Sequence, residues 1–388
     1  STRVRSSAAS DVYKRQACID ASKAIIASNR FGLYKAHPGS VQEAIANYRA
    51  LFTDPNVAGE EAIFIKGYGA PGTRIAHDYD AWNNPNQNAE GFPHRGRTNP
   101  ILELIDLYED YTNPGHAAPI ITTEDGKVSD NEGYRPYVAY RHFDSPEEIF
   151  KHKDARFFAC ITYPNSVWKG KKIVIQGGVI KPNGDLMSSP GACEHNGKTY
   201  YTFGAQFSKD YSGFDGTPNC TRTGFLMRKF LNENLTVTKE LQSTTDFMDF
   251  RYAEILLNFA EAVVEKGETD GNLLDMAKKG LNDLRKRAAH TTEVDLTLDN
   301  VLRERRIELA FENKGYWDLI RRRDFHSEFD NRRKMALVPM IDLRGEKPQY
   351  IFVRKFVPGA NSCTFQTHHY YRHIPGTSTN GLTQNPKH

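Results

Sequence analysis

The sequence has little of the features that most quickly narrow a protein's function. It contains no apolar run long enough to cross a membrane as a helix. Its net charge is only +3 with the histidines neutral, which is too small to indicate a nucleic acid or an anionic membrane surface as the partner. It does have 19 tyrosines and 29 glycines, spread over polar stretches. This composition predicts a loop-rich protein with enough aromatic side chains to form a core.

Cysteine is also scarce, with five residues in a chain of 388. The odd count excludes a complete set of disulfides within one chain, and the absence of CxxC spacing argues against a metal or redox site. Cys193 and Cys220 lie in the same loop-rich segment, so the sequence leaves open whether they form a disulfide. The GxSxG and HExxH patterns of hydrolases are absent as well. We therefore predict no catalytic residue, no metal and no cofactor.

Helical periodicity dominates residues 247–290. Apolar side chains recur there at steps of three and four residues, which places them on one face of an α-helix. The first stripe comprises Phe250, Ala253, Leu256, Leu257, Ala260, Val263 and Val264, and the second comprises Leu274, Ala277, Leu281, Leu284 and Ala288. Only the short segment Gly267–Gly271 separates them. Two helices joined by so short a link lie antiparallel, so the region predicts an αα-hairpin.

One hairpin cannot bury its outer face, and further amphipathic segments occur along the chain. The fold class is therefore predicted as mainly α, with tetratricopeptide-like hairpins and a loop-rich, β-poor ligand-binding region. Ser40 is expected to cap a helix whose first turn carries Glu43, and Trp317 is assigned to the helical core. We expect one domain over residues 17–388, with helical hairpins at 17–53 and 247–323, a loop-rich region at 61–245 and an irregular tail at 345–388.

Residues 1–16 differ from the remainder in character. They include no initiator methionine, show no apolar period and carry several arginines and lysines. We interpret them as a non-native leader, and we expect that the native segment before residue 17 is missing.

Two local patterns invite a functional interpretation that their context does not favour. Residues 67–72 form a GxGxxG string after a strand-like stretch, but a dinucleotide site needs a helix to begin at the last glycine. Pro71 and the polar residues 73–88 predict a loop instead. The pattern of residues 99–111 predicts a short helix with Leu102 and Ile105 facing inward. We interpret the acidic residues of this helix as a solvated face.

Three strings in the C-terminal half resemble the SusD/RagB family. Phe250–Ala262 (FRYAEILLNFAEA) is similar to one of its helices, and Glu304–Glu312 (ERRIELAFE) followed by Trp317–Arg321 (WDLIR) is similar to another segment. The ending Ile374–Pro386 resembles the closing motif of the family. Asn313-Lys314-Gly315 and the final Lys387-His388 depart from the usual pattern. The resemblance covers most of the chain from residue 17 onward.

The resemblance implies a non-catalytic, surface-exposed lipoprotein of the outer membrane in Bacteroidetes-type bacteria. Such proteins capture glycans or other nutrients and deliver them to a SusC-like TonB-dependent transporter. Their lipidated N-terminal region is expected to be missing here, so membrane attachment is expected only through an anchor that this chain lacks. No nucleic-acid partner is expected.

Sugar binding requires exposed aromatic rings, on which pyranose faces stack, together with amides or carboxylates for the hydroxyl groups. Three loop segments supply both kinds of residue. The candidate ligand-binding residues are Trp168, Tyr163, Trp82, Tyr79, Asn165, Tyr211 and Asp215. Trp168 is the leading candidate, followed by Tyr163 and Trp82.

The charged residues of the family-like strings receive a structural interpretation. We expect them to form paired charges between neighbouring helices, so that Glu308→Ala lowers stability and leaves ligand affinity nearly unchanged. The set is Arg251, Glu254, Glu261, Glu304, Arg305, Glu308 and Asp318.

Two other classes of function stay open on the sequence. A glycoside hydrolase needs two carboxylates facing each other across a cleft, and Asp78, Asp80, Asp210 and Asp215 are available. A helical-repeat adaptor would instead present a broad apolar groove on its helices to a protein partner.

Overall fold

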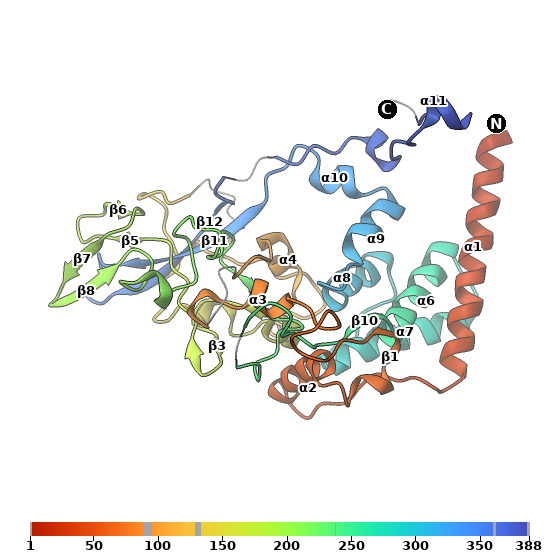
Figure 1. The fold of residues 1–388 in the computed structure, drawn as a ribbon, viewed down its shortest axis with the longest axis horizontal. Coiled ribbons are helices and arrows are strands. Elements are labelled where there is room, and N and C mark those ends of the chain that lie inside the picture. Colours follow the sequence, from red (N-terminus) through yellow and green to blue (C-terminus); the bar gives the residue numbers. More distant parts are fainter. Residues whose placement is uncertain (1, 89–94, 129–132, 237, 360–361, 386–388) are drawn as a thin grey trace.

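The computed structural model describes residues 2–88, 95–128, 133–236, 238–359 and 362–385 (Figure 1). Long helices gather at one end of the molecule, and short strands joined by loops form the other end. The helices are α1 Thr2–Ala27, α2 Val41–Thr53, α3 Tyr79–Asn83, α4 Leu102–Leu107, α5 Ala155–Cys160, α6 Tyr252–Lys266, α7 Gly271–Arg287, α8 Leu298–Glu308, α9 Gly315–Arg322, α10 Phe325–Phe329 and α11 Thr377–Asn380. The mainly helical class is confirmed.

The strands are short, and most of them pair locally. They are β1 Ala62–Lys66, β2 Ile161–Thr162, β3 Val167–Trp168, β4 Lys171–Lys172, β5 Val179–Ile180, β6 Leu186–Met187, β7 Ala192–His195, β8 Lys198–Tyr201, β9 Leu226–Met227, β10 Phe247–Arg251, β11 Met335–Asp342 and β12 Gln349–Phe356. Four of them form one sheet in the order β12-β11-β5-β6. No helix in the described part of the chain is both long and apolar enough to span a membrane.

The predicted hairpin is formed by α6 and α7, which pack against each other. Gly267 ends α6 in the left-handed region at φ +68°, and the Asp270 side chain caps α7 by accepting a hydrogen bond from the amide of Asn272 at 2.9 Å. Leu257 and Leu281 are fully buried. Periodicity and turn chemistry together therefore predicted this element correctly.

The first residues of that segment are not helical. Phe247–Arg251 is strand β10, which pairs antiparallel with β1, and helix α6 begins at Tyr252. Phe250 was therefore wrongly placed on the helical stripe. The pairing partner lies far away in sequence, so the local period could not reveal it.

The prediction of a helical hairpin at residues 17–53 was wrong. Helix α1 packs along α6, with Ile19 buried beside Phe259. Helix α2 packs on α5 instead, with Leu51 in the same cluster as Phe157. The expected cap is present, because Ser40 Oγ accepts a hydrogen bond from the amide of Glu43 at 3.1 Å. The connection of 13 residues between α1 and α2 leaves each helix free to choose a distant partner.

The C-terminal region also differs from the prediction. The tail predicted as irregular from residue 345 begins with β12, which pairs antiparallel with β11 over eight residues. All eight residues of β11 are buried, so the strand shows no alternation of apolar and polar side chains. A buried strand of this kind gives no signal of period two.

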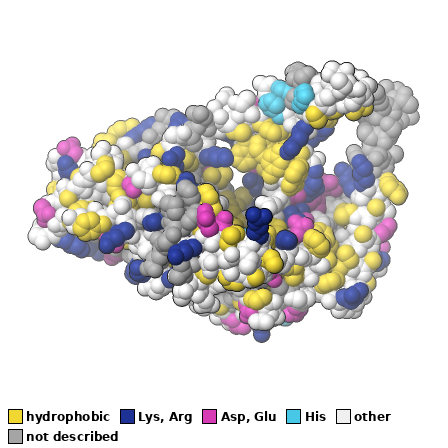
Figure 2. Space-filling model, in the orientation of Figure 1, with side chains coloured by type: hydrophobic (Ala, Val, Ile, Leu, Met, Phe, Trp, Pro, Cys, Tyr) yellow, Lys and Arg dark blue, Asp and Glu magenta, His cyan; other side chains and the backbone are white. Residues whose placement is uncertain are grey.

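Trp317 lies on the surface, not in the core. It is 58% exposed and stacks edge-on against Tyr316 with ring centroids 5.1 Å apart. Helix α9 has no buried residue. Asp318 and Arg321 hold it to its neighbours through ion pairs. Hydrophobic side chains also gather near α10 and the C-terminal segment (Figure 2), where Phe325 and Phe365 stack at 4.4 Å.

A buried network of charged side chains lies where the helices meet the loop-rich region. Arg251, at the end of β10, is 1% exposed and bonds Glu61 at 2.6 Å and Glu308 at 2.8 Å. Its Nε also bonds Glu312 at 2.7 Å. Arg287 of α7 pairs with Glu61 and Glu308 as well. Each of these charges is out of water, so its partners replace the solvation it has lost.

The network continues onto α5 and the loop after α7. Arg156 bonds Asp154 at 2.7 Å and Glu308 at 3.0 Å, and it also pairs with Glu304. His290 bonds Asp154 at 2.8 Å. Glu308 therefore forms ion pairs with three arginines that come from three different elements.

A second, more peripheral set of ion pairs holds α9 to α6 and α8. Arg305 bonds Asp318 at 2.7 Å and Glu254 at 3.4 Å. Glu261 bonds Arg321 at 2.6 Å. The seven residues interpreted as structural charges thus all lie in ion pairs between elements.

The acidic residues around α4 do not form a solvated face. Glu109 is fully buried and bonds Arg285 at 3.0 Å, and Asp106 bonds Arg354 at 2.7 Å. The interpretation of a solvated face was wrong because these carboxylates neutralise arginines that come from remote parts of the chain.

Glu308→Ala should destabilise the fold by about 3–5 kcal/mol, because it leaves Arg156, Arg251 and Arg287 with uncompensated buried charge. Urea unfolding measures the difference. The matched control is Glu293→Ala, which removes an ion pair between half-exposed side chains and should hardly change the midpoint. Equal midpoints for the two variants would contradict the structural role of Glu308.

Acid should unfold the protein through the same network. Burial alone would raise the pKa of Glu308, but Arg287, Arg251 and Arg156 outweigh it and hold that pKa well below its usual value. The pKa of Asp154 is held down in the same way by Arg156 and His290.

A depressed carboxylate pKa stabilises the folded state above the unfolded pKa of about 4, and this stability is lost as the pH falls further. We therefore expect a nearly constant melting temperature from about pH 7 to pH 5 and a steep fall below about pH 4. Calorimetry across this range measures it, and a flat profile down to pH 3 would be inconsistent with the network.

Candidate functional site

An aromatic pocket of about 480 Å³ opens between the loop after β1, helix α3 and the segment leading into β10. Its rings come from four separate stretches of the chain. The lining residues are Tyr68, His77, Asp78, Tyr79, Trp82, Asn83, Phe230, Thr245, Asp246, Phe247, Phe311 and Asn313. The volume lies in the range typical of small-ligand sites.

Helix α3 supplies the two rings that sequence analysis proposed for this segment. Tyr79 and Trp82 are three residues apart, so they share one face of the helix. Trp82 is 38% exposed, with the guanidinium of Arg97 5.6 Å from its ring centre. The Tyr79 hydroxyl donates inward to the carbonyl of Lys229 at 3.3 Å, which fixes the ring at the pocket wall.

The opposite face of α3 anchors the helix to the protein. Asp80 is fully buried and accepts a hydrogen bond from the amide of Asn232 at 2.8 Å. Burial raises the pKa of its carboxyl group. The side chain of Asn84 donates to the carbonyl of Asp80 at 2.8 Å. These contacts hold Tyr79 and Trp82 toward the pocket without using either ring.

The loops around the pocket are tied to each other by backbone hydrogen bonds. The amide of His77 donates to the carbonyl of Ser243 at 2.9 Å, and the amide of Ser243 donates back at 3.0 Å. Asp246 accepts from the amide of Tyr68 at 2.8 Å. The GxGxxG string lies in this loop, as predicted. The prediction of a loop over residues 73–88 was wrong in part, because α3 occupies Tyr79–Asn83.

The pocket continues as a groove. Thr245 and Asp246 also line a hollow of about 260 Å³ beside the end of α2, which includes Asp54 and Asn232. Asp54 and Asn232 in turn line a third hollow of about 490 Å³, which reaches Arg228. The three hollows share lining residues, and together they are called the groove below.

Trp168, the leading candidate from the sequence, does not face any ligand site. It is 0% exposed, packs with Ile173 and Leu231, and donates from Nε1 to the side-chain oxygen of Asn84 at 2.9 Å. The prediction that it stacks on a ligand is therefore corrected. Its indole has an internal hydrogen-bond partner, which allows full burial.

The neighbouring candidates Tyr163 and Asn165 also have structural surroundings. Tyr163 packs its ring against Phe150 at 5.4 Å and Phe157 at 5.2 Å. Asn165 adopts φ +66° in a turn and donates to Glu147 at 2.6 Å. Neither lines the groove.

Tyr211 and Asp215 lie apart from the groove as well. Tyr211 is 8% exposed and packs beside Phe203 and Cys220. Asp215 accepts from the amide of Thr217 at 2.8 Å, as is typical of a turn. Burial and then the charge of Asp215 raise the pKa of Tyr211 to about 12. Of the seven candidates, only Tyr79 and Trp82 line the groove.

Several pocket residues were missed by sequence analysis. Phe230, Phe247 and Phe311 are separated by long stretches of chain, and only tertiary packing brings them together. The pair Tyr79 and Trp82 gave a usable signal, because a spacing of three on a short helix places both rings on one side.

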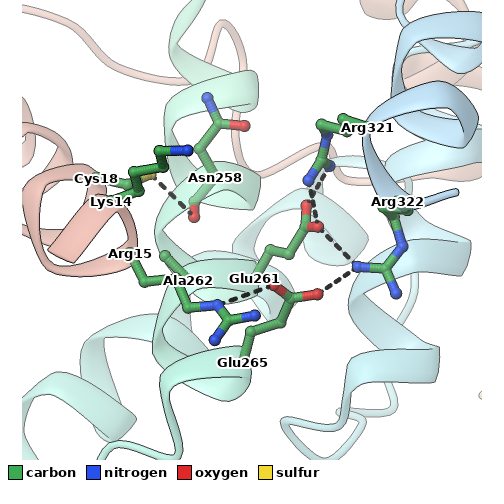
Figure 3. Close-up of a pocket in the computed structure, with 9 residues that line it drawn as sticks. All are labelled: Lys14, Arg15, Cys18, Asn258, Glu261, Ala262, Glu265, Arg321 and Arg322. Atoms are coloured by element: carbon green, nitrogen blue, oxygen red, sulfur yellow. Dashed lines mark hydrogen bonds and ion pairs between the residues drawn. The ribbon is translucent and has the colours of Figure 1, made fainter. Parts of the chain in front are cut away.

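A separate hollow of about 550 Å³ lies between α1, α6 and α9 (Figure 3). Charged side chains from the three helices point toward one another across it. Glu261 bonds Arg321 and Arg322 at 2.6 and 3.1 Å, and Glu265 bonds Arg15 at 3.3 Å. These groups already satisfy one another, so a ligand would have to displace existing ion pairs.

The cysteines offer no chemistry in the described part of the chain. All five are free, and Cys193 and Cys220 pack in different clusters, so no disulfide joins them. No group of three histidine, cysteine or acidic side chains among the described residues is arranged to hold a metal ion.

Comparisons with a family profile and with solved structures both point to SusD-like proteins. The profile of the SusD family matches residues 60–388. None of the curated proteins matches the sequence. Among solved structures, a SusD-like protein from Bacteroides fragilis superimposes with a TM-score of 0.62 at 19% identity, covering 97% of this chain and 63% of that protein.

Two further solved structures share the fold. A SusD-like carbohydrate binding protein from Bacteroides fragilis has a TM-score of 0.57 at 20% identity and covers 88% of this chain and 57% of its own. Surface glycan-binding protein A from Bacteroides fluxus has a TM-score of 0.53 at 17% identity and covers 100% of this chain and 61% of its own. The chain thus spans 57–63% of the length of these three structures.

Proposed function

Because the chain belongs to the SusD family, we propose that it is a non-catalytic binding protein for oligosaccharides and that the groove is its ligand site. The observation that carries the proposal is an aromatic pocket that shares lining residues with a hollow lined by amide and carboxylate groups. Aromatic rings bind the apolar faces of sugars, and the polar groups take their hydroxyls.

The exposed ring of Trp82 is the proposed stacking platform. Tyr79 lies beside it on α3, and the side chains of Asp246 and Asn313 line the same pocket. Two of the similar solved structures are named as carbohydrate or glycan binders, which supports the same class of ligand here.

Membership of the family supports a proposal for the cellular role. We propose that the protein acts at the surface of the outer membrane as a lipoprotein and passes its ligand to a SusC-like TonB-dependent transporter. Capture in an open groove suits such a role, because the ligand must be released unchanged.

The hydrolase alternative is less well supported by the site. Asp80 is buried beneath α3, and Asp215 caps a turn outside the groove. Asp78 lines the pocket, but one of its oxygens accepts a hydrogen bond from the amide of Leu241 at 2.5 Å. We expect no new reducing ends when the protein is incubated with the oligosaccharides it binds. Their appearance, at a rate proportional to protein concentration, would favour a glycoside hydrolase.

Trp82→Ala should weaken binding about tenfold, because a lost aromatic contact of about 1.4 kcal/mol corresponds to a factor of ten in Kd. A glycan array first identifies the strongest oligosaccharide, and titration calorimetry then compares the variants. Trp317→Ala is the matched control, since Trp317 is also exposed but lies on α9 outside the groove. Equal affinities of the wild type and Trp82→Ala would contradict the assignment of the site.

A further inference from the structure

The groove ends at a pair of arginines, and this end differs chemically from the aromatic pocket. Arg49 of α2 and Arg228, just after β9, both line the last hollow. We propose that this end binds a negatively charged substituent, a uronate carboxylate or a sulfate, so that the preferred ligand is an acidic oligosaccharide. The inference deepens the proposed function and depends on the groove being the sugar site.

Arg49 is a cation without an anionic partner in the described part of the chain. It is partly exposed, and its only hydrogen bond within that part runs from Nη2 to the carbonyl of Phe158 at 2.8 Å. Its Nε is buried and has no partner there. The other Nη group makes no bond to the described residues. The Nη1 group is therefore the part of this guanidinium that can donate charge-assisted hydrogen bonds to a carboxylate or a sulfate.

Arg228 is more deeply placed and is only partly neutralised. It is 6% exposed, its Nη1 donates to the carbonyl of Val167 at 2.8 Å, and its Nη2 pairs with Glu233. Its Nε is buried without a partner among the described residues. The guanidinium also lies 5.1 Å from the ring centre of Trp168. Packing therefore fixes this cation in place.

The two cations lie close enough to repel each other. Burial is the main cause that lowers the pKa of Arg228, to about 9, and the charge of Arg49 lowers it further. Glu233 offsets one positive charge, and its side chain is 42% exposed. A bound anion would relieve the repulsion between the two guanidinium groups.

The remaining charges of the groove limit which part of a bound oligosaccharide can be negatively charged. Lys229 lines the same hollow, but Glu312 neutralises it at 2.6 Å. Asp246 lines the middle of the groove, where it favours sugar hydroxyls and repels negative charge. Asp54 and Glu233 line the arginine hollow itself and offset part of its positive charge. The groove is thus suited to a chain with neutral units over the aromatic pocket and an acidic unit at the arginine end.

The test uses pairs of oligosaccharides that differ only in charge. Uronate-bearing oligosaccharides of the xylan and pectin types are each compared with their own methyl esters, and a sulfated galactan oligosaccharide is compared with its desulfated form. Titration calorimetry should show at least one acid bound about tenfold more tightly than its uncharged partner, with the preference falling as salt is added. The uronate and sulfate pairs distinguish the two sources of charge.

Arg49→Gln should abolish the difference between the acid and its uncharged partner. Arg15→Gln is the matched control, since it removes one arginine charge from the hollow between α1, α6 and α9 and should leave the preference intact. If every acid binds no better than its partner while Trp82→Ala still weakens binding, the acidic preference is refuted and the proposed function stands. If no oligosaccharide binds, or if Trp82→Ala is without effect, the proposed function itself fails.

Discussion

The need to pair buried charges governs how the two ends of this molecule are joined. Glu308 is fully buried and holds Arg156, Arg251 and Arg287. These come from α5, the end of β10 and α7, so one carboxylate connects the helical end with the strands and loops. Removing any single member leaves another charge without compensation, and the network therefore tolerates little rearrangement. The arrangement of the elements follows from this constraint as much as from apolar packing.

The same network forms the base of the groove. Phe52 lines the groove, and the ammonium group of Lys229 lies 4.1 Å from the centre of its ring. Arg251 lies over the same ring at 5.3 Å. Both cations are held by Glu312. Phe52 is therefore held in place by fixed ion pairs, and in a site that is already ordered the entropic cost of binding would be lower.

The helices could be predicted from the sequence wherever contacts are local. The α6–α7 hairpin follows from its period, from Gly267 and from the Asp270 cap, all of which lie within one stretch. The partners of α1 and α2, the pairing of β1 with β10 and the buried strand β11 depend on residues far away in sequence. The charged strings form ion pairs between elements, as expected of arginines and acids that are buried at helical spacing inside apolar stripes, and their structural role stays a prediction. The neutralised acids of α4 gave no such signal.

The candidate site was predicted only in part, and the two tryptophans show why. Trp82 and Trp168 both occur in polar, loop-like sequence, and sequence analysis ranked Trp168 first. The difference between them arises at the short helix α3. The side chain of Asn84, the residue that follows this helix, accepts a hydrogen bond from the indole N–H of Trp168, which satisfies that polar group and permits burial. Trp82 lies on the other side of the same helix and keeps its ring exposed. A tryptophan whose N–H finds an internal acceptor becomes core, and one whose helix turns it outward remains available to a ligand. Whether the ring is buried therefore depends on the partner residue, which lies outside the stretch of sequence around the tryptophan.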